Sequence, residues 1–264
     1  MSEKLQRLWA TKNKNDEWWS SFVTSPLAIA ANFIVVDWKW LTPNRLTVLS
    51  FITAVASVVL IIIGGQVQFY VAAALIHVSH ILDCMDGQMA RYRGVTSRSG
   101  GFFDKITDQV QVFLWFGAIG YAAYVQAENI LPVFLAFTGV AFYALRGYIK
   151  YVTIYIYMGD DKEYLEKATQ EVSEIENKTK DTAGLGHGVL ANLRWFVGEQ
   201  RKLLSFDEGV FIFMLSVSLI LNALTPMLWI FAISQMFYGL ARSLQRGRQL
   251  HLNQVRQILT TTEK

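Results

Sequence analysis

Cysteine and charged residues are scarce in this 264-residue chain, and each scarcity excludes a class of protein. Cys84 is the single cysteine, so no disulfide scaffold can form within the chain. Charged residues make up 17%, against about 25% in soluble domains, and hydrophobic residues make up 53%. The blocks Leu46–Gly65 and Gln109–Ala127 contain no Asp, Glu, Lys or Arg. Because about 20 apolar residues cross a ~30 Å hydrocarbon layer as a helix, the sequence predicts an integral membrane protein and excludes a disordered chain.

The apolar blocks predict an all-α, polytopic membrane fold. We expect six transmembrane helices, at residues 44–64, 67–90, 103–126, 129–151, 207–222 and 226–243. Thr42 and Pro43 suit the start of the first helix, because Thr can cap free N–H groups and Pro has none to cap. Residues 17–40 contain four Trp among polar residues, a composition typical of the headgroup boundary. We expect an N-terminal interfacial amphipathic helix there.

This layout divides the chain into three parts. Residues 1–42 are the expected cytoplasmic N-terminus and interfacial helix, residues 43–245 the six-helix transmembrane domain, and residues 246–264 a cytoplasmic tail. Within the middle part, residues 158–205 form an expected cytoplasmic insertion. Its Glu and Lys residues recur at helical spacing, which predicts a solvated surface helix; a partner-binding or regulatory element is the alternative.

Lys and Arg are absent from one side of the predicted bundle. The three turns at residues 64–68, 126–129 and 222–226 contain none, and all 24 lie in the termini, the other loops and the adjoining helix ends. By the positive-inside rule, both termini and the charged loops are cytoplasmic. We expect a bacterial inner membrane and, because the first residues are polar and charged, no cleaved signal peptide.

Four aspartates lie within 26 residues, at the end of the predicted second helix and the start of the third: Asp83, Asp86, Asp104 and Asp108. At ~100° per residue, each pair shares one helical face. The connection between the two helices is short, so the helices should be antiparallel and the four carboxylates should converge near the cytoplasmic mouth. Ionisable groups at membrane depth are costly and therefore indicate function.

Four like charges this close together need compensation. Nearby cations could supply it, namely Arg91, Arg93, Arg98 and Lys105, but a divalent ion or a pair of them is the more economical solution. Carboxylate oxygens without a Cys or His set suit Mg²⁺, Mn²⁺ or Ca²⁺ rather than Zn²⁺. Two such ions would bridge a pyrophosphate and stabilise a leaving phosphate.

Small residues flank the aspartates. Gly87 and Ala90 leave one helical face open to a planar base or a sugar. Gly100 and Gly101 open the next helix, whose N-terminal N–H groups favour a phosphate. The acidic and small residues together form the pattern Asp83-x2-Asp86-Gly87-x2-Ala90-Arg91-x8-Gly100-x3-Asp104-x3-Asp108. This pattern resembles, at every fixed position, the signature of the class I CDP-alcohol phosphatidyltransferase family.

The resemblance implies a role for each motif residue. Asp83, Asp86 and Asp104 would hold the metal ions, for which we expect two Mg²⁺ or Mn²⁺, and Asp108 would lie beside them and act as the catalytic base. The CDP pocket would be lined by Asn44, Thr47, Asp83, Gly87, Ala90, Arg91 and Gly100. The family cleaves a CDP-linked alcohol, releases CMP and joins the remaining phosphate to an acceptor alcohol, and its members resemble homodimers.

Three basic residues are candidates for binding an acceptor phosphate. Arg146 and Lys150 lie four residues apart at the inner end of the fourth predicted helix, and Arg242 lies in the sixth. They could clamp the phosphate of glycerol phosphate or inositol phosphate. The alternative is that they are ordinary basic anchors at the membrane surface.

Two further features near the motif have a structural interpretation. His77, His80 and Asp83 recur every three residues, which could indicate a metal triad, but histidines inside a bundle are more often hydrogen-bonded between helices. Cys84 is expected to be a small packing residue.

Our leading hypothesis is an enzyme of phospholipid biosynthesis that transfers a phosphatidyl group from CDP-diacylglycerol to a small hydroxylated acceptor, with or without a phosphate. In the alternative, a CDP-linked polar alcohol such as CDP-inositol or CDP-choline donates its phospho-alcohol to a lipid or polyol. A second alternative is a non-enzymatic divalent-cation transporter, although carboxylates at one face rather than at the midplane disfavour it. Nucleic acid is not an expected partner, because no binding module is present.

Overall fold

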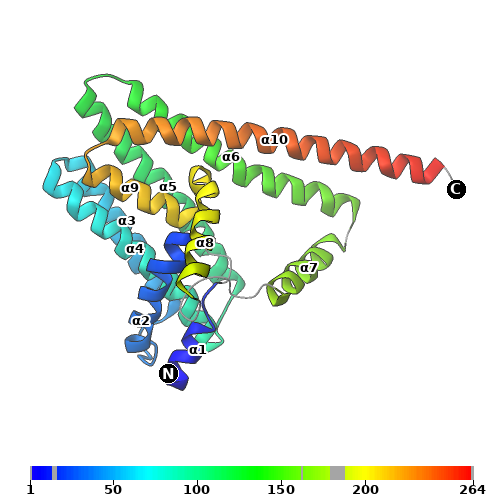
Figure 1. Cartoon of the computed structure of the whole chain (residues 1–264), viewed down its shortest axis with the longest axis horizontal. Helices are drawn as coiled ribbons and strands as arrows, with labels where there is room; N and C mark the ends of the chain where they lie inside the picture. The colour runs from blue at the N-terminus through cyan, green and yellow to red at the C-terminus, as the bar shows by residue number, and fades with distance from the viewer. Residues whose placement is uncertain (1, 14–16, 162, 179–187, 263–264) are drawn as a thin grey trace.

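The computed structural model describes residues 2–13, 17–161, 163–178 and 188–262, and this part of the chain is helical throughout, without strands (Figure 1). The elements are α1 (Glu3–Trp9), the π-helical turn η1 (Ser20–Thr24), α2 (Ser25–Val35), α3 (Pro43–Ile63), α4 (Gln66–Arg93), α5 (Arg98–Ala127), α6 (Leu131–Asp160), α7 (Tyr164–Lys178), α8 (Val189–Glu199), the 3₁₀ turn η2 (Gln200–Ser205), α9 (Glu208–Ile220) and α10 (Leu224–Thr262). The predicted all-α fold is confirmed.

In the described ranges, five helices are long and apolar enough to cross a membrane: α3, α4, α5, α6 and α10. The chain is therefore an integral membrane protein. The predicted helix at 207–222 is present as α9, but it has only 13 residues and spans about 20 Å, less than a hydrocarbon layer. Five of the six predicted helices therefore meet the length of a membrane span, and α9 is a shorter apolar helix at the sixth predicted position. Before α9, Phe206 adopts a left-handed backbone (φ 52°) that separates α9 from η2.

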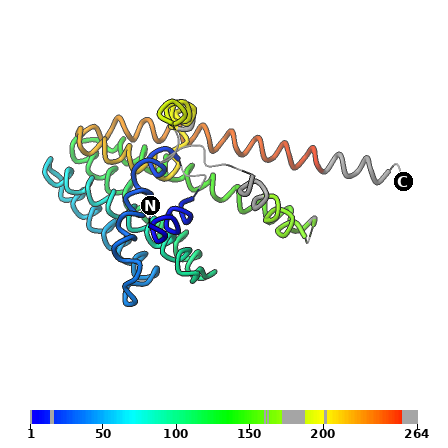
Figure 2. The backbone as a smooth tube through the Cα atoms, turned by 60° about the horizontal axis from the view of Figure 1, so that its bottom comes forward, coloured from blue at the N-terminus to red at the C-terminus, as the bar shows by residue number. Residues whose placement is uncertain are grey.

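Two helices are longer than their apolar segments. α6 ends at Asp160 rather than 151, and α10 ends at Thr262 rather than 243. They contact each other extensively and extend together beyond the rest of the bundle (Figures 1 and 2). Hydropathy marks the end of the membrane-buried part of a helix, but the helix itself continues until a breaker ends it.

Tight turns set the order of the core helices. Gly64 and Gly65 both have positive φ (77° and 97°), which lets α3 turn directly into α4. The two helices pack along their length, and α5 packs on α3. The core is aromatic: Phe116 of α5 stacks on Phe231 of α10 with ring centroids 3.7 Å apart, and the Trp115 indole donates to Ser57 Oγ of α3 at 2.8 Å.

The N-terminal elements pack on α4. Asn32 of α2 is fully buried, and its amide donates to the Met85 carbonyl at 2.9 Å and to Gln88 Oε1 at 3.2 Å. The exposed face of α2 is apolar, with Leu27 and Ile34 outward. This differs from the predicted amphipathic pattern because the polar groups point inward, where α4 supplies their partners, and the outward face suits lipid.

Candidate functional site

The turn between α4 and α5 brings the aspartates together. α4 ends at Gly94, whose left-handed backbone (φ 67°) closes the helix, and α5 begins after Ser97, whose hydroxyl accepts from the Gly100 N–H at 3.0 Å. α4 and α5 therefore present their acidic turns to the same space. One carboxylate oxygen from each of Asp83, Asp104 and Asp108 lies within 4.8 Å of the others.

All four aspartates line one cavity of about 160 Å³, which we call the carboxylate cavity. Asp86 is nearly inaccessible to solvent, and the Thr47 hydroxyl of α3 donates to it. The remaining lining residues come from α4, α5, α9 and the N-terminal segment: Asn13, Glu17, Ser20, Ser25, His80, Cys84, Gly87, Gln88, Arg91, Lys105 and Glu208.

The carboxylate cavity fits a divalent cation. Asp83 Oδ1 is buried and, in the described structure, has no hydrogen-bond partner, which is costly for a carboxylate oxygen. The donors around it are carboxylate oxygens, the ligands of Mg²⁺ and Mn²⁺. Lys105 supplies part of the compensating charge, with Nζ 3.0 Å from Asp104 Oδ2 and 3.3 Å from Asp108 Oδ2.

Arg91 and Arg93 of α4 donate hydrogen bonds to backbone carbonyls of the N-terminal segment. Arg91 Nε donates to the Thr11 carbonyl at 2.8 Å. Arg93 donates to the carbonyls of Val36 and Leu41 at 2.5–2.9 Å, so it fastens the link between α2 and α3 to α4. Of the four cations considered from sequence, Lys105 forms ion pairs with two of these aspartates, Asp104 and Asp108.

On one side the carboxylate cavity adjoins a second cavity of about 200 Å³, which we call the nucleotide-side cavity. It contains every residue predicted for the CDP pocket except Asp83, which lines the carboxylate cavity instead. The residues are Asn44, Thr47, Gly87, Ala90, Arg91 and Gly100, together with Asp86 and Asp104. A Cβ at Gly100 would lie 3.0 Å from Ser97 Oγ and 3.9 Å from Asn44 Oδ1, so a side chain here would press on the hydroxyl that caps α5.

Asp83 and Asp108 also line a cavity of about 350 Å³, the acceptor-side cavity, whose other walls come from α4, α5, α6 and α9 and include the apolar residues Ile106, Val112, Trp115, Phe211 and Ile212. It shares Gln109, Tyr143, Gly147 and Lys150 with an adjoining cavity of about 370 Å³. The latter brings together all three predicted acceptor-phosphate residues, Arg146, Lys150 and Arg242.

Arg146 also has a structural role. Its Nη1 donates to the Ser205 carbonyl and, at 2.6 Å, to Gln235 Oε1, and its Nη2 lies 3.8 Å from Asp207 Oδ1. The guanidinium therefore ties α6 to α10 and to the turn before α9. Lys150 and Arg242 are exposed at the same cavity.

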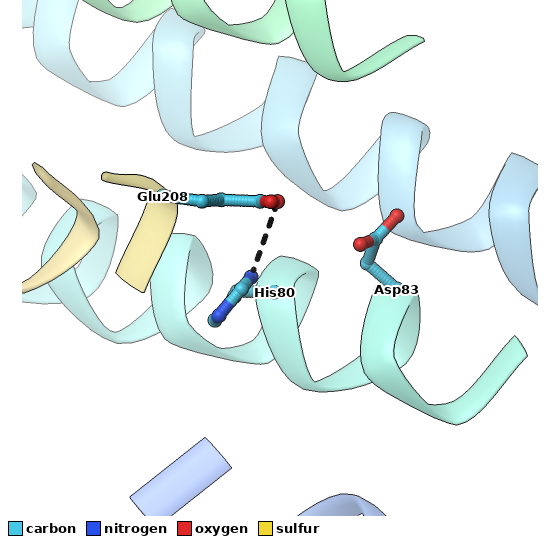
Figure 3. A group of neighbouring side chains, drawn as sticks. All are labelled: His80, Asp83 and Glu208. Carbon is cyan, nitrogen blue, oxygen red and sulfur yellow. Dashed lines mark ion pairs between the residues drawn. The ribbon is translucent and has the colours of Figure 1, made fainter. Parts of the chain in front are cut away.

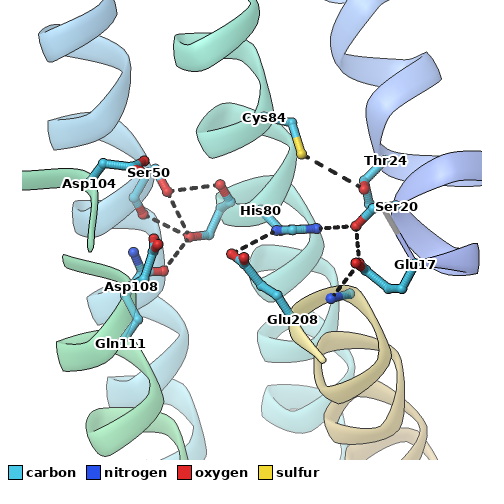
Figure 4. A network of polar contacts seen from close by, with 12 residues as sticks. Glu17, Ser20, Thr24, Ser50, His80, Cys84, Asp104, Asp108, Gln111 and Glu208 are labelled. Carbon is cyan, nitrogen blue, oxygen red and sulfur yellow. Dashed lines mark hydrogen bonds and ion pairs between the residues drawn. The ribbon is translucent and has the colours of Figure 1, made fainter. Parts of the chain in front are cut away.

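The sequence did not reveal Glu208 as a residue of the site. Glu208, in the first turn of α9, points from α9 toward Asp83 and lies above His80 (Figure 3). The His80 ring contacts Ser20 Oγ at 3.0 Å through Nε2 and Glu208 Oε1 at 3.7 Å through Nδ1 (Figure 4). The interpretation of His80 as hydrogen-bonded between elements is confirmed, while the His77 ring lies against Trp19, with centroids 5.4 Å apart. The sequence feature that could have indicated Glu208 is a single Glu at the first position of an apolar helix.

Comparisons with known proteins agree with this geometry. The crystal structure of Mycobacterium tuberculosis phosphatidylinositol phosphate synthase with CDP-DAG bound has the same fold, with a TM-score of 0.52 and 17% identity, covering 85% of this chain and 93% of that one. The bifunctional IPC transferase and DIPP synthase of Thermococcus kodakarensis is 28% identical over 113 residues, 43% of this chain. The match spans 25% of that relative's length. The family model of CDP-alcohol phosphatidyltransferase matches residues 40–176, just over half of the 264 residues, and the chain therefore belongs to the CDP-alcohol phosphatidyltransferase family.

Proposed function

We propose that this protein transfers a phosphatidyl group from CDP-diacylglycerol to a small hydroxylated acceptor and releases CMP. One observation carries the proposal: the carboxylate cavity lies between the nucleotide-side cavity and the acceptor-side cavity, and shares aspartates with both. A donor beside Asp86 and Asp104 and an acceptor beside Asp83 and Asp108 would meet at the carboxylate cavity, as an in-line displacement requires.

On the nucleotide side, the residues act by shape and by polar contacts. Gly87, Ala90 and Gly100 leave space for the base and ribose, and Asn44 and Arg91 offer hydrogen-bonding groups. The N-terminal N–H groups of α5 favour the pyrophosphate. The positions that the family resemblance implies for CDP binding thus lie together in this cavity.

Two divalent ions, Mg²⁺ or Mn²⁺, are proposed to be held by Asp83, Asp86 and Asp104. When bound, they neutralise the charge that develops on the CMP leaving group. Thr47, by donating to Asp86, fixes the direction of that carboxylate. Lys105 lowers the repulsion between Asp104 and Asp108.

Asp108 is the proposed general base. It lines both the carboxylate cavity and the acceptor-side cavity, so it can accept the proton of an acceptor hydroxyl. The hydroxyl oxygen attacks the phosphorus that bears the lipid and forms a new ester bond. The bond between this phosphorus and the bridging oxygen to CMP breaks, and CMP leaves. An acceptor phosphate would lie near Lys150 and Arg242, with Arg146 behind them.

The test is an assay of the purified protein with labelled CDP-diacylglycerol and a panel of acceptors: glycerol phosphate, inositol phosphate, inositol, serine and choline. We expect CMP release that depends on one of these alcohols and on a divalent ion. Asp108→Asn should abolish turnover while CDP-lipid binding remains, and near-normal activity in that variant would remove the base assignment. Absence of CMP release with every acceptor would overturn the proposed function.

A second candidate uses the same cavities with the donor reversed, so that a CDP-linked polar alcohol donates to a lipid or polyol. The Thermococcus relative, named as an IPC transferase and DIPP synthase, is the observation that favours keeping it. Replacing CDP-diacylglycerol by CDP-inositol or CDP-choline in the same assay separates the two. Family membership disfavours the transporter alternative.

The membrane arrangement belongs to the same proposal. We propose that both termini and the carboxylate cavity face the cytoplasm, in a bacterial inner membrane, since the Lys- and Arg-free turns all lie at the other end of the bundle. A homodimer is also proposed, and cross-linking of the protein in membranes would test it.

A further inference from the structure

Glu208 is an ionisable residue of the site that lies outside the region matched by the family model. It opens α9, an apolar helix, and its carboxylate points into the space between α4 and α5, toward the aspartates (Figures 3 and 4). It lines both the carboxylate cavity and the acceptor-side cavity. Glu208 therefore borders the space that an acceptor would occupy in order to reach Asp108.

A chain of contacts fixes the direction of the Glu208 side chain. His80 lies between Glu208 (3.7 Å) and Ser20 (3.0 Å), and the Ser20 hydroxyl donates to Glu17 (Figure 4). Glu17 in turn accepts from the Gly209 N–H at 2.7 Å, next to Glu208 itself. The network joins the N-terminal segment, α4 and α9, and its member His80 lines the acceptor-side cavity beside Glu208.

Helix-end electrostatics do not account for this arrangement. An acidic residue in the first turn stabilises a helix whichever way it points, and a water-facing Glu208 would do so without repulsion from other carboxylates. Here the carboxylate lies within 4.8 Å of an Asp83 oxygen, where the two like charges repel each other. A side chain held against such a cost indicates a role in binding.

A second helix that lines the acceptor-side cavity, α5, offers a donor. The Gln109 amide nitrogen is buried and, within the described residues, has no hydrogen-bond partner. Gln109 and Tyr143 line both this cavity and the adjoining basic one. A carboxylate acceptor on one wall and an unsatisfied amide donor on another suit a ligand with several hydroxyl groups, because each hydroxyl both donates and accepts.

We propose that Glu208 selects the acceptor, by accepting a hydrogen bond from a second hydroxyl of a polyol whose first hydroxyl lies beside Asp108. The inference rests on the proposed transfer function and narrows its acceptor to polyols with at least two hydroxyl groups. A monohydroxy alcohol cannot donate this second hydrogen bond, so the site binds it less tightly in the transition state than it binds the polyol.

The experiment compares the polyol that the acceptor panel identifies with its deoxy analogue, which lacks the second hydroxyl; for glycerol phosphate this is propane-1,3-diol phosphate. In the wild type, kcat/KM for the polyol should exceed that for the analogue by about 10- to 100-fold. In Glu208→Ala the ratio should fall to within about 3-fold, with the KM for the CDP-linked donor and the Mg²⁺ requirement unchanged. Glu163→Ala, which removes an exposed carboxylate between α6 and α7, is the control and should keep the wild-type ratio.

Three results would overturn the inference. The first is an unchanged polyol preference in Glu208→Ala, and the second is an equal loss of kcat/KM with the polyol and with its analogue. The third is a change in the donor KM or in the Mg²⁺ requirement, which would assign Glu208 to metal binding. If Glu208→Ala does not fold, Glu208→Gln, which keeps the shape and removes the charge, is measured for the same ratio. A monohydroxy acceptor preferred by the wild type would also overturn it, whereas an inactive wild type would instead overturn the proposed function.

Discussion

At the residue scale, the absence of a side chain at Gly100 keeps the nucleotide-side cavity open. We predict that Gly100→Ala raises the KM for the CDP-linked donor by about 10-fold or more. The added methyl group would lie 3.0 Å from Ser97 Oγ, which caps α5 through the Gly100 N–H, and 3.9 Å from Asn44 Oδ1. It would displace the cap and narrow the nucleotide-side cavity. Gly117→Ala, whose Cβ meets nothing within 4 Å, is the matched control on α5; a similar donor KM in both variants would contradict the assignment of this wall.

Lys105 tests the charge balance of the carboxylate cavity. We predict that Lys105→Gln lowers the Mg²⁺ concentration for half-maximal activity by about 3- to 10-fold, because its ammonium lies within 3.3 Å of both Asp104 and Asp108 and competes with a divalent ion for them. The measurement is a Mg²⁺ titration of initial rates at saturating substrates. Lys167→Gln, which removes an exposed cation paired with Asp161, should leave the titration unchanged. An increase in the Mg²⁺ requirement would show that Lys105 assists binding rather than competing.

At the scale of elements, the docking of the N-terminal segment depends on Gly209. A Cβ there would lie 2.5 Å from Ser20 Oγ and closer still to Glu17, whose carboxylate accepts from the Gly209 N–H. We predict that Gly209→Ala displaces η1 from α9 and lowers the thermal unfolding midpoint by several degrees, about 1–3 kcal/mol of stability. Trp18 and Trp19 pack on Phe213 of α9, so their fluorescence should change as well. Gly198→Ala, with open space around its Cβ, is the control. Wild-type fluorescence and stability in Gly209→Ala would show that the segment docks without this contact.

The elements also show what sequence reasoning reaches. The motif aspartates were predictable because their positions on two consecutive helices are fixed by helical geometry and a short turn. Glu208 was not, because it lies 125 residues from Asp83 along the chain and meets it only through the packing of α9 on α4. The position of α9 was predictable, at 207–222 against Glu208–Ile220 in the structure, because its residues after Glu208 are almost all apolar.

At the scale of the whole molecule, the sites of chemistry and the basic residues lie at one end of the bundle. The turns after α3, α5 and α9 lie at the other end and contain no Lys or Arg. A CDP-linked donor is synthesised and used where nucleotides are found, so the proposed orientation and the proposed function require each other. An orientation with the carboxylate cavity outside would remove the substrate supply, which makes topology a test of function.

The single cysteine makes this topology measurable. In a Cys84→Ala background, cysteines at Val67 and Leu221, both exposed at the Lys- and Arg-free end, should react with an impermeant maleimide added to intact cells. Cysteines at Val95, in the turn between α4 and α5, and at Glu163 should react only after the membrane is opened. We expect at least about a 10-fold difference in labelling, because the hydrocarbon layer excludes the charged reagent. Labelling of Val95→Cys in intact cells would reverse the orientation and, with it, the assignment of the carboxylate cavity to the cytoplasmic side.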